Sequence, residues 1–529
     1  MELLSQKYKI PHLDLSTFPV DVEAIKLVPQ DQAQMAELAV FQIIGKQLKI
    51  GVHNPGKDET KATVKDLENK NYTCSLFLVS RHSLEHAWEY YKKIVQTIDS
   101  TAGSTSVHAS MLQELQGSVR NLSEIAGLIE KTYAAGRISE ALEVLLAAAL
   151  DVGASDIHIE PQEESARLRL RIDGVLHDVA RVPVKFFHLF LSRIKLLSEL
   201  KLNIHDQAQD GRFTIKTPDG EIEVRTSTIP GPDGENIVLR VLDPKNIGVK
   251  FEALGLQPWV IELLGKELQK PNGMILTTGP TGSGKTTTLY AFLKKVQNPE
   301  IKIITLENPI EYHLPGIEQT QVSPEKGYTF AAGLRASLRQ DPDVILVGEI
   351  RDQETAETAM QAALTGHLVF STLHTNNAAG TIPRLLDLGA KPSVIAPALN
   401  VAIAQRLLRK LCPACRKATE ITPETKEKIA KELAGFPQGI PTPKPEEWKI
   451  FESSGDGCEK CTGGYKGRIG IYEIIMIDEK IEQLILKSPS EFEIQKEALN
   501  QGQINMRQDG LLKILAGITD FSEVEKAVG

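Results

Sequence analysis

The chain has 529 residues, of which 41% are hydrophobic and 24% are charged, and its formal net charge is −9. A chain of this length is expected to form several domains rather than one core. The acidic balance gives no general support for a nucleic-acid partner, and no apolar run reaches the roughly 18 residues that span a bilayer. We therefore expect a globular protein that meets any membrane only peripherally, through a partner.

Residues 1–95 predict a small α/β domain. Residues 39–55 hold two short strand-like stretches separated by Gly-Lys and closed by Asn-Pro, which is typical of a hairpin. Leu84, Trp88 and Tyr91 then recur at helical spacing. We interpret this domain as a docking domain.

Residues 96–120 are rich in Ser, Thr and Ala without a periodic pattern, and we interpret them as a flexible linker. Residues 121–243 begin with helical stretches and continue with stretches in which polar and apolar residues alternate. That alternation is typical of strands with one buried face, so this segment predicts an α+β domain.

Residues 244–410 predict an α/β domain with a parallel sheet. Four apolar stretches, at 273–279, 302–308, 343–349 and 367–375, each end in polar residues. Continuous apolar strands separated by helices indicate a sheet covered on both faces. Ligands of such sheets bind at the carboxyl ends of the strands, where these polar residues fall.

The stretch "GPTGSGKT" follows the first of these strands and fits the pattern G-x-x-x-x-G-K-[ST]. Glycines let backbone amides turn towards phosphate oxygens, Lys285 reaches the β- and γ-phosphates of ATP, and the Thr286 hydroxyl holds Mg²⁺. The N-terminus of the following helix adds a partial positive charge. The alternative is a chance glycine-rich turn. The predicted nucleotide-binding residues of this loop are Gly279, Pro280, Thr281, Gly282, Ser283, Gly284, Lys285, Thr286 and Thr287.

Two carboxylates end neighbouring apolar strands. Glu349 can polarise a water molecule for attack on the γ-phosphate, and Glu307 can support Mg²⁺ through water. The alternative for both is capping a loop or pairing with Arg351. His367 and His374 flank the fourth strand seven residues apart, so their side chains start on opposite faces.

His374 lies at the carboxyl end of that strand and is the better candidate for a γ-phosphate sensor. His367 is a candidate nucleotide-binding residue, and the alternative is a histidine satisfied within the core.

Residues 411–475 carry two C-x-x-C pairs, Cys412/Cys415 and Cys458/Cys461. Two such pairs are typical of a structural zinc site with four thiolates and no open position. A redox dithiol pair is the alternative. Cys74 stands alone and is interpreted as a small hydrophobic residue. Residues 476–529 predict a C-terminal helical region.

Five stretches together resemble the secretion ATPase superfamily, in its branch of type IV pilus assembly and type II secretion ATPases. They are "GPTGSGKTTTLYAFL", "ITLENPIEY", "LRASLRQDPDVILVGEIRD", "TGHLVFSTLHTNNA" and the two C-x-x-C pairs. The resemblance implies an α/β fold class: a RecA-like P-loop ATPase domain, preceded by α+β N-terminal domains of which the second is PAS-like, with a zinc-binding insertion.

In this family the catalytic glutamate falls on Glu349, the magnesium-supporting acid on Glu307, and the histidines on His367 and His374. Family arginines that reach the nucleotide from the same or a neighbouring subunit match Arg225 and Arg240. A weaker candidate is Arg212. The chain departs from the family at Asn308, where an aspartate is usual, so we expect Asn308 to be dispensable for hydrolysis.

The resemblance implies a cytoplasmic homo-hexamer that uses ATP, Mg²⁺ and Zn²⁺. It would act at the cytoplasmic face of the inner membrane and power type IV pilus assembly through a platform protein. Type II secretion and competence pseudopilus systems are alternatives with the same architecture. A nucleic-acid translocase and a non-hydrolysing nucleotide sensor are alternatives of other classes; the low aromatic content of 5% disfavours the former.

Overall fold

The computed structural model describes residues 5, 8, 10–15, 20–44, 46–70, 72–95, 104–105, 122–217, 220–243 and 248–529. The chain divides into two compact units, residues 1–106 and 107–529. The predicted linker, residues 96–120, lies outside the described residues except for 104–105. Among the described residues, no helix is long and apolar enough to cross a membrane.

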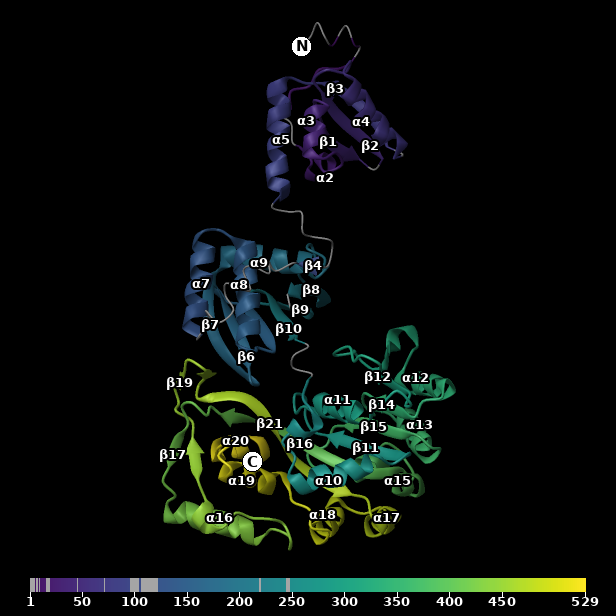
Figure 1. Ribbon diagram of the computed structural model, residues 1–529, viewed down its shortest axis with the longest axis vertical. Coiled ribbons are helices and arrows are strands. Elements are labelled where there is room, and N and C mark those ends of the chain that lie inside the picture. The colour runs from purple at the N-terminus through teal and green to yellow at the C-terminus, as the bar shows by residue number, and fades with distance from the viewer. Residues whose placement is uncertain are drawn as a thin grey trace. The chain divides into compact units, whose positions relative to one another are not determined.

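The first unit is a three-stranded sheet with helices (Figure 1). The predicted hairpin is confirmed, because β1 and β2 pair antiparallel, and β3 then adds in parallel to β2. Trp88 and Tyr91 donate hydrogen bonds to the carbonyls of Leu38 and Val28, which fixes α5 to the unit. Its elements are α2 (Val22–Ile25), α3 (Gln30–Met35), β1 (Leu38–Ile44), β2 (Gln47–Val52), α4 (Asp58–Asn69), β3 (Thr73–Leu78) and α5 (Arg81–Val95). The two-residue strand β4 (Ser104–Thr105), which is no part of this sheet, follows in the chain.

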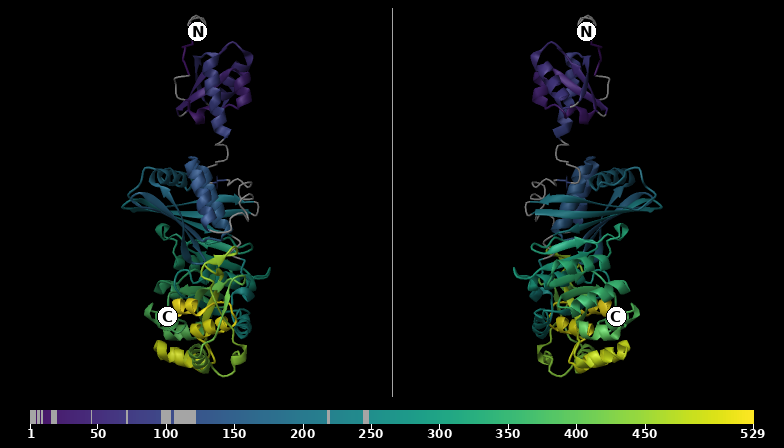
Figure 2. Two further views of the ribbon diagram at one scale, coloured as in Figure 1. Left: turned by 90° about the vertical axis from the view of Figure 1, so that its left-hand side faces the viewer. Right: turned by 90° about the vertical axis from the view of Figure 1, so that its right-hand side faces the viewer.

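The second unit opens with an antiparallel sheet in the order β8-β9-β10-β5-β6-β7. Helices pack on one face of this sheet, and Figure 2 shows them in blue in front of the fanned strands in its left view. Strict alternation of burial along β6 confirms the predicted half-buried strands. The elements are α7 (Leu122–Ala134), α8 (Ile138–Asp151), β5 (Asp156–Pro161), β6 (Ser165–Ile172), β7 (Val175–Pro183), α9 (Val184–Leu197), β8 (Gln209–Thr217), β9 (Gly220–Gly231) and β10 (Gly234–Leu242).

A nine-stranded sheet follows, in the order β13-β12-β14-β15-β11-β16-β21-β20-β19. The four predicted apolar strands are β11, β12, β14 and β15, and they pair in parallel as expected. The elements that build its parallel part are η2 (Phe251–Ala253), α10 (Pro258–Glu267), β11 (Gly273–Thr278), α11 (Lys285–Val296), β12 (Ile303–Glu307), β13 (Glu318–Gln321), η3 (Pro324–Lys326), α12 (Phe330–Ser337), η4 (Leu338–Gln340), β14 (Val344–Val347), α13 (Gln353–Leu364), β15 (Leu368–Leu373), α14 (Thr381–Asp387) and α15 (Pro392–Ala398).

Both faces of this sheet are covered, because successive residues of β11 point into different cores. Met274 and Leu276 join the core that contains α13, whereas Ile275 joins the core that contains α11. Full burial on both faces explains why these strands are continuously apolar. The carboxyl ends of β11, β12, β14 and β15 therefore lie along one edge of the sheet.

The rest of the chain adds an antiparallel extension and four C-terminal helices. In Figure 2 the yellow C-terminal helices lie beside the green elements of the sheet. The elements are β16 (Leu399–Leu411), β17 (Lys417–Thr419), α16 (Pro423–Ala434), η5 (Pro445–Glu447), β18 (Ile450–Glu452), β19 (Gly457–Cys458), β20 (Cys461–Thr462), β21 (Tyr465–Met476), α17 (Glu479–Ile485), α18 (Glu491–Asn500), α19 (Met506–Leu515) and α20 (Phe521–Val528).

Candidate nucleotide site and metal centre

The predicted phosphate loop joins β11 to α11 and has a backbone that requires glycine. Gly279, Gly282 and Gly284 have φ values of 145°, 79° and 89°, a region that side chains with a Cβ rarely adopt. A Cβ on Gly284 would also lie 2.7 Å from Nε2 of Gln405, and one on Gly279 would lie 2.6 Å from the Gln405 carbonyl. The loop is thus packed so tightly against β16 that a side chain at either position would require the structure to shift.

Lys285 begins α11, and its ammonium group donates hydrogen bonds to the carbonyls of Gly279 (2.7 Å) and Pro280 (3.1 Å). Burial lowers the pKa of Lys285, and the nearby Glu349 carboxylate opposes this shift. Ser283 is 4% exposed, and its hydroxyl has no hydrogen-bond partner among the residues that the structure describes. A half-buried cation and an unpaired buried hydroxyl in a loop at a helix N-terminus fit a phosphate group.

Thr286 and Thr287 occupy the first turn of α11, and Thr286 is exposed. Its hydroxyl is therefore accessible for the magnesium role that the sequence predicts, and hydroxyl oxygen is a ligand type that Mg²⁺ accepts. Pro280 and Thr281 lie at the exposed crest of the same loop.

Glu349 lies just after β14 and has two partners. One of its carboxylate oxygens lies 2.7 Å from Nε of Arg351, in an ion pair, and 3.5 Å from Nε2 of His374. The side chains of Arg351 and His374 are 72% and 50% exposed, whereas that of Glu349 is 16% exposed. The structure thus brings Glu349 and His374 together at the carboxyl edge, and it also shows the pairing with Arg351 that the sequence left open.

Glu307 ends β12 and is 4% exposed. Its carboxylate accepts hydrogen bonds from the hydroxyls of Tyr290 (2.5 Å) and Thr305 (2.6 Å) and from the side-chain amide of Gln319 (3.1 Å). Burial is the main cause that raises the pKa of Tyr290, and the Glu307 carboxylate adds to it. Because protein donors occupy both oxygens, Glu307 is positioned to tie β12 to α11.

His367 is not brought to the phosphate loop. It precedes β15, and its Nδ1 lies 2.9 Å from the carbonyl of Ala362 at the end of α13. His374 follows the other end of the same six-residue strand, so the two histidines are separated by about 20 Å of extended chain. The physical reason is the strand β15, because one histidine precedes its first residue and the other follows its last residue. Within one chain His367 therefore matches the alternative of a satisfied histidine.

The candidate arginines form one row across the antiparallel sheet. Arg212 on β8 pairs in register with Arg225 on β9, which pairs with Arg240 on β10. Arg225 donates to Glu223 at 3.1 Å and to the carbonyl of Ile310, three residues after Glu307. Arg240 donates to Asp156 at 3.1 Å.

The positive charges of this row act on Tyr312, which lies in the segment that follows β12. Burial raises the pKa of Tyr312 to about 12, while the positive charges of Arg225 and Arg240 act in the opposite direction. Arg212 lies 4.0 Å from Glu223 and its side chain is 77% exposed. The structure thus places two of the predicted arginines near the segment 308–312.

Sequence reasoning missed three polar residues around the loop. Tyr290 and Gln319 hold Glu307, and Arg406 on β16 lies beside Gly279, with Nη1 at 3.0 Å from the position of a Cβ there. Tyr290 lies on the apolar face of α11, and Arg406 lies more than a hundred residues after the loop. No local motif marks either residue, so only the folded chain reveals them.

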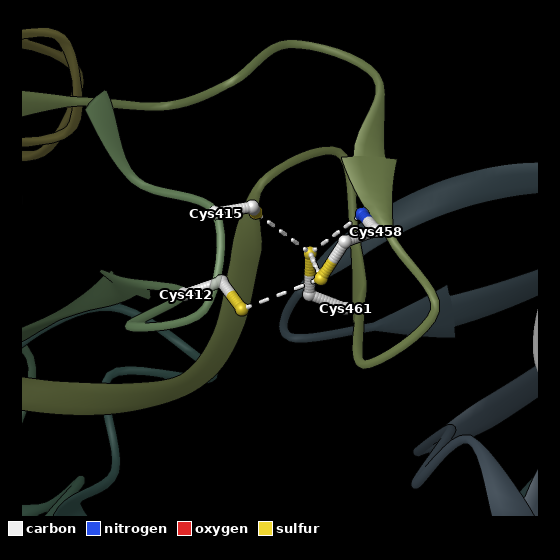
Figure 3. Close-up of side chains that lie close together, drawn as sticks. All are labelled: Cys412, Cys415, Cys458 and Cys461. Carbon is white, nitrogen blue, oxygen red and sulfur yellow. Dashed lines mark hydrogen bonds between the residues drawn. The ribbon is translucent and has the colours of Figure 1, made fainter.

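The four predicted cysteines lie together (Figure 3). The Sγ···Sγ distances are 3.8 Å for Cys412–Cys458, 3.6 Å for Cys415–Cys461 and 3.7 Å for Cys458–Cys461. A zinc ion with four thiolates at about 2.3 Å requires sulfur–sulfur edges of about 3.8 Å. All four thiols are free of disulfides. The donor set and its spacing therefore fit a tetrahedral zinc ion.

A separate cavity of about 360 Å³ lies between α10 and β21. Apolar side chains including Leu256, Val260 and Ile474 line it, and no residue of the phosphate loop does. The cavity is thus distinct from the nucleotide site.

A parallel sheet that carries a glycine-rich loop, its lysine and a carboxylate at one edge defines a P-loop nucleoside triphosphatase. The family described as Type II/IV secretion system protein matches residues 132–526, and the MshEN domain matches residues 8–96. The chain belongs to this secretion ATPase family, and it is an ATP hydrolase.

Known proteins similar to this chain agree with that assignment. The type IV pilus assembly ATPase PilB of Myxococcus xanthus is 36% identical over 526 residues, which cover 99% of this chain and 90% of the relative. Type II secretion system protein E of Dickeya dadantii is 45% identical over 384 residues, or 72% and 74% of the two chains. The Legionella pneumophila ATPase DotB, at 22% identity and a TM-score of 0.52 over 73% of this chain and 95% of that chain, shares the fold.

Proposed function

We propose that this chain is the motor ATPase of a type IV pilus assembly machine. The observation that carries the proposal is the similarity to a pilus assembly ATPase along 99% of the chain, including the first unit. The similarity to a type II secretion ATPase is higher in identity but spans 72% of the chain. Type II secretion is therefore the second candidate, and loss of surface pili against loss of protein export in a strain that lacks the gene distinguishes the two.

In the proposed reaction the loop amides, Ser283 and Lys285 bind the phosphates of ATP, and Thr286 holds Mg²⁺, which neutralises phosphate charge when bound. Glu349 exchanges its contact with Arg351 for a water molecule and orients it towards the γ-phosphate. His374 lies 3.5 Å from the same carboxylate and senses that exchange. Glu307 keeps a fixed position because it accepts a hydrogen bond from the hydroxyl of Tyr290 on α11.

Replacing Glu349 with Gln tests the catalytic assignment. We expect the Glu349→Gln variant to lose about 100-fold in kcat, because an amide cannot accept the proton of water, while ADP affinity stays within about threefold. The matched control is Glu354→Gln, which removes an equally sized carboxylate from the exposed ion pair with Arg335. Steady-state phosphate release measures both, and a Glu349→Gln rate equal to the control would remove Glu349 from the mechanism.

The cysteine cluster is proposed to hold a structural Zn²⁺. Four sulfur ligands leave no position for a water molecule, so the ion would supply no catalytic chemistry. Its place, between the ends of β16 and β21, supports a role in fixing those two strands.

We further propose a homo-hexamer that works at the cytoplasmic face of the inner membrane through a platform protein, with residues 1–95 as the docking domain. Separation of the first unit from the ATPase unit supports this division of labour. Deleting residues 1–95 should abolish co-sedimentation with membranes that contain the partner proteins and leave ATP turnover within about twofold. Lys285→Ala should show the reverse pattern. Membrane recruitment of the deletion variant would refute the docking role.

A further inference from the structure

Arg406 reaches the nucleotide site from a strand that carries none of the family motifs. Strand β16 runs parallel to β11, with Ala404 in register with Thr278 at the end of β11. Arg406 therefore lies two residues beyond the carboxyl edge of that strand pair, beside the phosphate loop. Its Nη1 is 3.0 Å from the position that a Cβ on Gly279 would take.

The guanidinium of Arg406 is bound by carbonyl groups alone. Nη1 donates to the Gln405 carbonyl at 3.0 Å and Nη2 donates to the Asn376 carbonyl at 2.8 Å. No carboxylate of the described residues forms an ion pair with it, and the nearest acidic influence, Glu473, accepts from the Ala378 amide. Two of five N–H groups are used, so three donors remain.

Arg409, on the same strand, shows the contrast. Its Nε and Nη2 donate to the two oxygens of Glu523 at 3.0 Å and 2.6 Å. That bidentate pair neutralises the Arg409 charge within the fold. Arg406 is half-buried without such a partner, which is costly unless a ligand supplies the negative charge.

Arg406 also acts on Lys285. Burial lowers the pKa of both side chains, and the positive charge of Arg406 lowers that of Lys285 further. Neither cation has a carboxylate partner within ion-pair distance among the described residues. Two partly desolvated cations at one glycine-rich loop match a polyanion that spans both.

We propose that Arg406 binds the phosphate chain of the nucleotide, as a second cation beside Lys285. The inference rests on nucleotide binding at the phosphate loop. Because Nη2 also holds the carbonyl of Asn376, two residues after His374, Arg406 joins the bound phosphates to the loop that carries His374.

The test measures binding of a fluorescent ADP analogue with Mg²⁺ to the full chain, and its displacement by pyrophosphate and by adenosine. We expect Arg406→Gln to raise Kd for ADP and for pyrophosphate about tenfold, equivalent to about 1.4 kcal/mol, and to leave adenosine displacement unchanged. Arg406→Lys, which keeps the charge but loses the forked donors, should raise both values about threefold.

Arg468 provides the matched control, since it is an exposed arginine on the neighbouring strand β21. Arg468→Gln should bind all three ligands within twofold of the parent chain. Parent-like pyrophosphate binding in Arg406→Gln would overturn the proposal, as would equal losses for adenosine and pyrophosphate, which would indicate a general distortion of the site. Should Arg406→Gln not fold, unchanged pyrophosphate binding in Arg406→Lys would overturn it. A parent chain that binds no nucleotide would instead refute the site itself.

Discussion

Two carboxylates at neighbouring strand ends have opposite surroundings. Glu307 is buried and accepts three hydrogen bonds from protein donors, so both of its oxygens are engaged within the fold. Glu349 is held by Arg351 and His374, whose side chains are largely exposed. An exposed partner can leave a carboxylate at little cost because water replaces it. Glu349 is therefore the carboxylate that can exchange partners during a reaction cycle.

Glu473 is a third acidic group at this edge, and it couples the site to pH. It is 8% exposed and accepts from the amide of Ala378, in the loop after His374. Burial is the main cause that raises its pKa, Glu491 on α18 adds to the rise, and Arg406 on β16 opposes it. The folded chain therefore binds this proton more tightly than the unfolded chain.

The sign of the resulting pH dependence follows from linkage. An acid whose pKa is raised on folding contributes stability below its unfolded pKa of 4.5 and loses it as pH rises through the folded pKa. Glu473→Gln keeps an acceptor for the Ala378 amide but cannot ionise. We expect the melting temperature of the variant to increase relative to that of the parent chain as pH rises above about 4.5. Thermal unfolding of both proteins across pH measures the difference, and parallel curves would contradict the prediction.

At the scale of elements, the pair β16–β21 connects the two sites. The strands pair antiparallel from Val401↔Met476 to Leu411↔Tyr465. Gln405 and Arg406 contact the phosphate loop from the middle of β16, and Cys412 follows its end. One ladder of hydrogen bonds therefore runs from the cysteine cluster to the strand that supports the loop.

Removing one thiolate tests the metal centre. We expect the parent chain to contain one zinc per chain by elemental analysis, and Cys458→Ser to contain less and to melt at a lower temperature, because metal binding stabilises only the folded chain. Cys74→Ser is the control, since Cys74 belongs to the first unit and the four clustered cysteines belong to the second. Equal zinc content in both variants would exclude the four-cysteine site.

For the whole molecule, the arginine row can serve a nucleotide of its own chain or one of a neighbouring chain, and the two arrangements predict different behaviour. Within one chain Arg240 is paired with Asp156 and Arg225 with Glu223. If these arginines bind phosphate, they must first leave their carboxylate partners. The closing of the two domains would then depend on bound nucleotide. A ring with head-to-tail interfaces would place each row against a neighbouring site.

Mixing two inactive variants decides between these arrangements. Lys285→Ala retains the arginine row, and the double variant Arg225→Ala/Arg240→Ala retains the phosphate loop. If the row acts on the neighbouring chain, a random equal mixture should recover up to about one quarter of the parent ATPase activity, because that share of interfaces combines both intact parts. If the row acts within its own chain, the mixture stays inactive. Native mass spectrometry confirms that mixed rings form.

Several features could be predicted from sequence because their physical cause is local. The loop 279–286 needs glycines for its positive φ values and a lysine at the helix start, and both stand in eight consecutive residues. The parallel strands are continuously apolar because both faces are buried. The two cysteine pairs have a ligand spacing that few other structures require. The sequence by itself thus determined the fold class, the phosphate loop and the metal-ligand set.

The surroundings of those groups were decided only by tertiary structure, because they join residues far apart in the chain. Tyr290 meets Glu307 and Arg406 meets Gly279 through the order of strands in the sheet. The strand β15 likewise separates His367 from His374, because one histidine precedes it and the other follows it. A motif records which chemical groups are present, whereas strand order and register decide which of them share one edge, and no local pattern encodes that choice.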